Sequence, residues 1–88
     1  MVEIFREHLT TNHAVRLRSS RGGGALPRVL NVTDESGRLW EFDCMNEGRN
    51  GFCISGNGWR AFAENKINCT VTLYKNEDDN SYSITVRY

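Results

Sequence analysis

The strongest constraint on the fold comes from two stretches in which apolar and polar residues alternate on both sides of a turn. The first covers residues 30–44, where the turn is the sequence DESG. A period of two is typical of a strand with one buried face, and turn residues between two such strands predict a β-hairpin. Gly37 supplies the positive φ that a tight turn needs. The alternating apolar positions are Leu30, Val32, Trp40, Phe42 and Cys44.

The second alternating stretch covers residues 69–88 and has NEDDN as its turn. It predicts another hairpin, whose last strand is amphipathic over its full length. Two further short strands are expected at GFCIS and, more weakly, at VEIFR. The chain is therefore predicted to be mainly β. The alternating apolar positions of this hairpin are Cys69, Val71, Leu73, Tyr82, Ile84, Val86 and Tyr88.

Only residues 56–67 have the spacing of a helix, because Trp59, Phe62, Ala63 and Ile67 fall on one helical face. Asn57 is the expected N-cap, and Asn65 is expected to end the helix in the left-handed conformation. A helix of about two turns is marginal on its own, so packing of its aromatic residues must stabilise it. We expect it to plug one end of a sheet that curls into a small barrel.

The length of 88 residues, with 39% hydrophobic and 25% charged residues, is that of one ordinary globular domain. No apolar run is long enough to span a bilayer, and no secretory signal is visible. We therefore expect a soluble, intracellular chain without a membrane partner. The three cysteines, Cys44, Cys53 and Cys69, are odd in number and widely spaced, which favours reduced, buried thiols.

Two long polar connections interrupt the predicted strands, at residues 8–27 and 45–51. Long loops in compact domains are usually functional or disordered. The formal net charge is zero, but residues 1–28 carry five arginines against two glutamates, which makes this part of the chain basic. These loops are the expected working surface.

Four stretches of this sequence occur in the order FREHLTTNHAVRLR, LPRVLNVTDESGRLWEFD, GWRAFAENKI and CTVTLYKNEDDNSYSITVR, and in this order they resemble the B3 DNA-binding domain of plant transcription factors. FREHLTTNHAVRLR is similar to the family's first strand and first DNA-facing arm, and LPRVLNVTDESGRLWEFD to its central hairpin with an Asp-x-x-Gly-x-x-Trp pattern. GWRAFAENKI is similar to its Gly-Trp-x-x-Phe helix, and CTVTLYKNEDDNSYSITVR to its final hairpin. The resemblance covers nearly the whole chain.

The resemblance implies that residues 1–88 form a single B3-like DNA-binding domain. Its fold would be a mainly β, seven-stranded open pseudobarrel with one or two short helices. Two arms would grip the major groove of double-stranded DNA: the first arm, Thr10 to Arg18, and the second arm, Asn46 to Asn50. Such a domain would belong to a nuclear transcriptional regulator of a plant.

Two stretches depart from the family's pattern. The segment SSRGGGALPR is too short and Gly-rich for the helix that follows the first arm in the family, so we expect that helix to be absent. Asn68 and Cys69 stand where the family has Gly-Asp, so we expect that turn to be built differently.

Arg can present two donors to guanine O6 and N7, and Asn can pair in the same way with adenine, so arms holding both can read base edges. Thr10, Thr11, Ser19 and Ser20 are suited to phosphate contacts. The predicted DNA-binding residues are Thr11, Asn12, His13, Arg16, Arg18, Asn46, Arg49 and Asn50.

Other functions are weighed against DNA binding. His8 and His13 could in principle pair with Cys44 or Cys53, but no catalytic spacing supports an enzyme, and the Gly run at Gly22 lacks the residues of a phosphate loop. We expect no catalytic residue, no metal, no cofactor and no small-molecule substrate.

The serious alternative is a B3-like module for protein–protein interaction, with weak or no DNA binding. The neutral net charge and the acidic Glu47 inside the second arm favour it. Protein partners are also possible through the rest of a larger protein.

Overall fold

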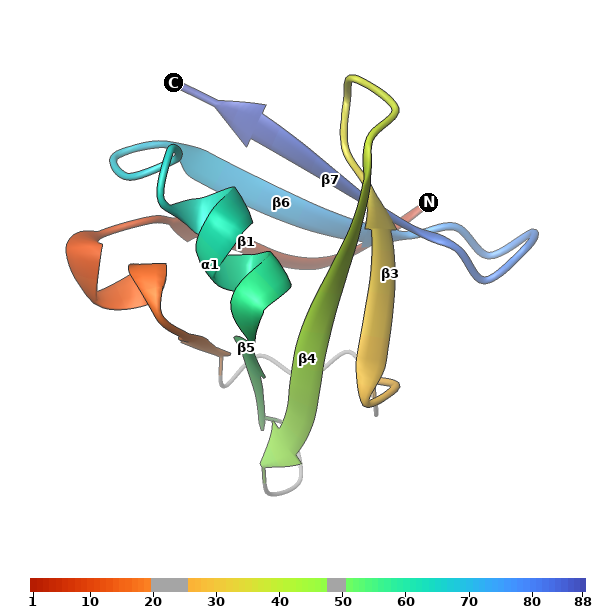
Figure 1. Ribbon diagram of the computed structural model, residues 1–88. Coiled ribbons are helices and arrows are strands. Elements are labelled where there is room, and N and C mark those ends of the chain that lie inside the picture. Colours follow the sequence, from red (N-terminus) through yellow and green to blue (C-terminus); the bar gives the residue numbers. More distant parts are fainter. Residues whose placement is uncertain (20–25, 48–50) are drawn as a thin grey trace.

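The computed structural model describes residues 1–19, 26–47 and 51–88. The described chain forms seven strands, one α-helix and one short 3-10 helix, Thr11–Ala14 (Figure 1). The strands are β1 (Val2–His8), β2 (Leu17–Ser19), β3 (Val29–Thr33), β4 (Leu39–Glu47), β5 (Gly51–Ser55), β6 (Thr70–Lys75) and β7 (Tyr82–Arg87), and the helix is α1 (Asn57–Ala63). Within these residues no helix is long and apolar enough to cross a membrane.

The strands form a single curled sheet in the order β1-β6-β7-β3-β4-β5-β2. All neighbours are antiparallel except β3 and β7, which are parallel over two residue pairs. The sheet bends round until β1 approaches β5, where the rings of Phe5 and Phe52 lie 5.6 Å apart. The predicted seven-stranded open pseudobarrel is confirmed.

Both predicted hairpins are present. β3 pairs with β4, and Leu30, Val32 and Phe42 point into the core. β6 pairs with β7 from Thr70 to Lys75. The alternation of the last strand does not extend to its end, because β7 stops at Arg87 and Tyr88 is 97% exposed.

The helix α1 packs against β4 and β5, as Figure 1 shows, and fills the barrel with aromatic rings. Trp59, Phe62 and Ala63 are buried, as predicted. The Trp59 ring meets Phe42 edge-on at 5.2 Å, and Phe62 meets Trp40 in the same way at 5.2 Å. The plug is therefore a cluster of four rings rather than a single inserted side chain.

The ends of α1 differ from the prediction. The N-cap is Gly56, with a φ of 96°, and Asn57 is already the first helical residue. The helix ends at Ala63, so Ile67 lies outside it, and the left-handed conformation falls on Asn68 instead of Asn65. The reason is that the turn after α1 is held by backbone hydrogen bonds of Asn68 and Cys69 with Leu9, just before β6 begins at Thr70.

The Asp-x-x-Gly-x-x-Trp pattern is a hydrogen-bonded cap on the first hairpin. One carboxylate oxygen of Asp34 accepts hydrogen bonds from the backbone N–H groups of Ser36 and Arg38, and the other accepts one of 2.8 Å from Trp40 Nε1. The hydrogen bonds from Trp40 and Ser36 lower the pKa of Asp34 to about 2. Gly37 closes the turn with a φ of 89°, as predicted.

Candidate nucleic-acid interface

The first arm begins where β1 leaves its partner strand. Leu9 is fully buried, and its backbone N–H donates to the Cys69 carbonyl at 2.8 Å. The Asn68 N–H donates in turn to the Leu9 carbonyl at 2.8 Å. Asn tolerates the left-handed conformation, with a φ of 71° here, better than most residues do. The base of the first arm is therefore pinned to the turn before β6.

The plug helix supports the tip of the first arm. The indole Nε1 of Trp59 donates a hydrogen bond of 2.7 Å to the backbone carbonyl oxygen of His13, which lies in the 3-10 helix. The backbone N–H of Thr10 donates to His13 Nδ1 at 3.0 Å and closes the same turn. The arm is thus held from below by a fully buried side chain.

The last part of the first arm is a strand. Residues 17–19 were expected in a long polar loop, but they form β2, which pairs with β5. Leu17 is fully buried, whereas Arg18 is exposed, in the alternation of a half-buried strand. The pattern Arg-Leu-Arg-Ser carried this signal, but three residues are too few to identify a strand among basic neighbours. Arg16 is also exposed, just before β2.

The start of the predicted second arm is strand rather than loop, because β4 runs on to Glu47; β5 begins at Gly51. The side-chain amide of Asn46 is engaged within the chain: it accepts a hydrogen bond from the Leu26 N–H at 3.0 Å and donates one to the Leu26 carbonyl at 2.9 Å. Asn46 therefore fixes the backbone before β3. Arg49 and Asn50 lie outside the described residues, as do Ser20 and Gly22.

The two arms meet in an ion pair. Arg18 Nε lies 3.5 Å from Glu47 Oε1, and both side chains remain substantially exposed. Arg18 is on β2 and Glu47 is on β4, so the contact passes over β5, which lies between them. Sequence reasoning treated Glu47 only as a repulsive group, because the register that brings it to Arg18 depends on β2.

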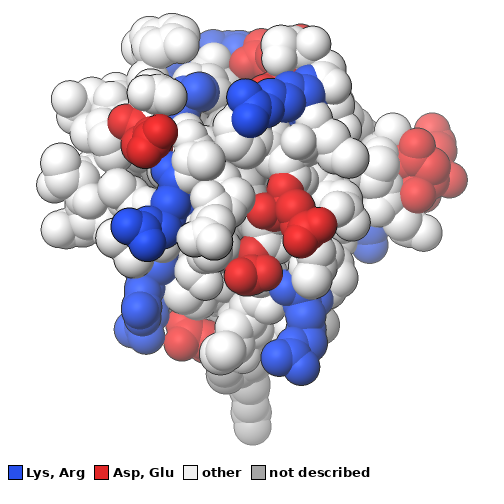
Figure 2. All heavy atoms as spheres, in the orientation of Figure 1, with Lys and Arg blue, Asp and Glu red and all other residues white. Residues whose placement is uncertain are grey.

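The remaining predicted DNA-binding residues all keep some exposed surface. Thr11, Asn12, Arg16 and Arg18 are exposed, and His13 is half-buried. Figure 2 shows basic side chains on the side of the molecule where the segment after β1 lies in Figure 1, with acidic side chains close to them. The structure brings Arg16 and Arg18 together at the start of β2. The surface around them is mixed in charge rather than uniformly basic.

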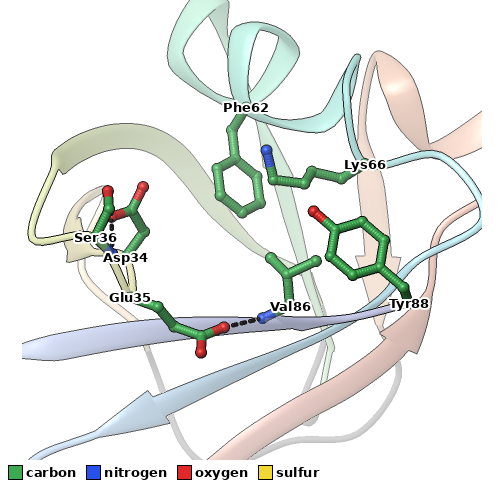
Figure 3. A pocket seen from close by; sticks show the side chains of 7 residues that line it. All are labelled: Asp34, Glu35, Ser36, Phe62, Lys66, Val86 and Tyr88. Atoms are coloured by element: carbon green, nitrogen blue, oxygen red, sulfur yellow. Dashed lines mark hydrogen bonds between the residues drawn. The ribbon is translucent and has the colours of Figure 1, made fainter.

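A hollow of about 380 Å³ lies between the first hairpin turn, the end of α1 and β7 (Figure 3). Phe62, Lys66 and Tyr88 point into it. Its acidic groups are already bonded within the chain, since Glu35 accepts a hydrogen bond of 2.7 Å from the Val86 N–H and pairs with Arg87. The contacts of Glu35 at this hollow attach the hairpin turn to β7.

The three cysteines are buried, as predicted. Burial, with a smaller contribution from Cys53, raises the pKa of Cys44 to about 11, which leaves the thiol protonated and a weak nucleophile. In the described ranges, no group of three His, Cys, Asp or Glu side chains is arranged to hold a metal ion.

Comparison with known proteins identifies the fold. No model of a protein family matches the sequence, and no curated protein matches it significantly. Among solved structures, the Arabidopsis FUS3–DNA complex matches with a TM-score of 0.65 and 14% identity, covering 98% of this chain and 97% of that one. The hypothetical Arabidopsis thaliana protein At1g16640.1 matches with a TM-score of 0.71 and 16% identity, covering 98% and 94%. The fold predicted from the B3 resemblance is thus confirmed.

Proposed function

We propose that this chain, which has the B3 fold, binds double-stranded DNA in the major groove through its two arms. It would act as the single recognition domain of a nuclear transcriptional regulator. The observation that carries the proposal is the pair of exposed arginines, Arg16 and Arg18, at the start of a strand in a fold shared with a protein solved as a DNA complex. A rigid strand positions base-reading side chains better than a free loop does.

The arms offer both kinds of contact that sequence-specific binding needs. Arg16 and Arg18 can each place a pair of donors on guanine O6 and N7, and Asn12 can pair with adenine. Thr10, Thr11 and the backbone of the 3-10 helix are suited to phosphates, which fix the register of the protein on the duplex. His13 is held by its own turn and so supports the arm geometry.

The decisive experiment is binding selection from a randomised duplex pool, followed by a salt titration on the selected duplex. A protein that makes several Arg–phosphate contacts loses affinity steeply as salt rises, by an order of magnitude or more between low and physiological salt. Enrichment of a motif together with that slope supports the proposal. A pool that stays random after repeated rounds contradicts it.

The second candidate is a protein-interaction module on the same fold. Two contacts favour it: the amide of Asn46 is bonded to Leu26, and Arg18 is paired with Glu47, so both side chains have partners inside the chain. A neutral interface changes little with salt, because few counterions are released. Affinity for a protein partner that is flat across the same titration, without duplex binding, would favour this function.

A further inference from the structure

The ion pair between Arg18 and Glu47 is the charged contact that joins the two arms. β2 and β4 each pair with β5, so Arg18 lies beside Cys53, and Glu47 beside Gly51. Successive residues on a strand point to opposite faces, so Arg18 and Glu47 share the outer face and the contact crosses the strand between them.

The geometry of the ion pair determines which nitrogens of Arg18 can still bind another group. The closest approach in the pair joins Glu47 Oε1 to Arg18 Nε, at 3.5 Å. Within the part of the chain that the structure describes, the terminal nitrogens of Arg18 make no hydrogen bond. These nitrogens are the donors that a guanidinium can present to guanine O6 and N7. The pair therefore restrains the guanidinium while its fork stays open.

The charge of Glu47 also acts differently on the phosphate contacts and the base contacts of Arg18. A carboxylate beside Arg18 repels a phosphate, which carries a full negative charge, and it neutralises part of the attraction that drives non-specific binding. Guanine O6 and N7 are neutral acceptors, so the carboxylate penalises them much less. The same residue thus weakens backbone contacts and leaves base contacts possible.

We propose that Glu47 is a positioning residue that sets the sequence specificity of the first arm through Arg18. This inference rests on the proposed function. Glu47 holds the guanidinium by its Nε, turns the fork toward a guanine in the major groove, and disfavours duplexes that offer Arg18 only phosphate.

The test compares Glu47→Gln with the matched control Glu3→Gln. Glu3 pairs with Arg6 at 3.0 Å on β1, and side-chain exposures are 60% and 40% for Arg6 and Glu3 against 64% and 40% for Arg18 and Glu47. Both variants remove one charge from an exposed ion pair, but Glu3 lies at the end of β1 away from the first arm. Each is titrated with the selected duplex and with a shuffled duplex of the same composition.

Glu47→Gln is expected to tighten binding to the shuffled duplex by about threefold to tenfold, with a log–log salt slope steeper by about 1. Binding to the selected duplex should tighten less or weaken, so the ratio of the two affinities falls. Glu3→Gln should leave that ratio unchanged. If Glu47→Gln changes both duplexes by the same factor as Glu3→Gln, the inference is overturned, although the proposed function stands.

A second measurement tests the route through Arg18. Each guanine of the selected duplex is replaced in turn by 7-deazaguanine, which lacks the N7 acceptor. At one position, we expect the replacement to weaken duplex binding by the parent protein by about tenfold. The same replacement should have little effect on binding by Arg18→Lys and a reduced effect on binding by Glu47→Gln. A penalty in Glu47→Gln equal to that of the parent overturns the inference. A parent protein that binds no duplex overturns both it and the proposed function.

Discussion

The buried indole of Trp59 donates its hydrogen bond to the backbone carbonyl of His13, 46 residues earlier in the chain. One residue therefore has two tasks: its ring belongs to the aromatic cluster of the core, and its N–H fixes the first arm. Folding of the core and placement of the candidate interface are coupled through this bond. The coupling can be tested by separating the ring from the N–H.

Trp59→Phe keeps an aromatic ring but removes the donor. We expect it to cost roughly 1 to 3 kcal/mol of stability and to weaken duplex binding, because the His13 carbonyl loses its partner and the arm loses its support. The matched control is Trp40→Phe, which removes the indole bond to Asp34 at the far hairpin turn. Thermal melts and duplex titrations on both variants check this. Equal losses of DNA affinity would contradict an arm-supporting role.

Asp34 should make stability depend on pH at acidic values. Its folded pKa of about 2 lies below the ordinary value of 3.8 for an Asp side chain, so the ionised form is stabilised by folding. The contribution is complete above about pH 5 and is lost as the pH falls through 4 toward 2. After allowance for solvent screening it amounts to about 1 kcal/mol.

Urea denaturation across that pH range gives the measurement. Asp34→Asn should lower the stability at neutral pH and flatten the acid dependence, since an amide cannot accept the Trp40 and backbone hydrogen bonds in the same way. Asp78→Asn, in the turn of the other hairpin, is the control. If the stability of Asp34→Asn falls as steeply with acid as that of the parent, other carboxylates cause most of the pH dependence.

Gly58 is required where α1 lies against β4. A Cβ at this position would collide with the backbone carbonyl oxygen of Glu41. Gly→Ala at an exposed helical site stabilises by up to about 1 kcal/mol, whereas here the backbone must shift, so we expect Gly58→Ala to destabilise by roughly 1 to 3 kcal/mol. The exposed neighbour Arg60→Ala should change stability by less than about 0.5 kcal/mol. A melting temperature that rises in Gly58→Ala would disprove the close approach.

The sequence predicted most of the fold because its signals are local. Alternation in the two hairpins and the spacing of Trp59 and Phe62 each depend on residues within one element. The ends of α1 were wrong because the turn that leads into β6 decides them, and that turn is set by tertiary pairing of Leu9 with Asn68 and Cys69. Local capping preference was overridden there.

The candidate interface was harder to predict than the core. β2 is only three residues long, so its alternation could not be distinguished from chance, and Leu17 was assigned to a loop. The contacts of Trp59 with His13 and of Arg18 with Glu47 join residues far apart in the sequence, so no local pattern predicts them. Residue types indicated which side chains could contact DNA, but not which already have partners.

Arg16→Ala is the direct test of base or phosphate contact by the first arm. Loss of a bidentate guanine contact should weaken binding to the selected duplex by about 1 to 3 kcal/mol, and the loss should depend on sequence. Arg6→Ala removes the same side chain from β1 and serves as the control. Circular dichroism should show both variants folded. Unchanged affinity for Arg16→Ala would remove this residue from the interface.

Asn46 separates a structural role from base reading. Because its amide both donates to and accepts from the Leu26 backbone, Asn46→Ala should lower stability by roughly 1 to 3 kcal/mol, with two backbone groups left without their partner. Asn46→Asp keeps the acceptor for the Leu26 N–H but turns a carboxylate oxygen toward the Leu26 carbonyl oxygen, which repels it, so its loss should be at least as large. If Asn46 has this structural role, Asn46→Ala lowers the melting temperature and weakens binding to all duplexes alike. A residue that reads adenine would instead leave the melt unchanged and weaken only duplexes that carry the selected base, which would contradict the structural role.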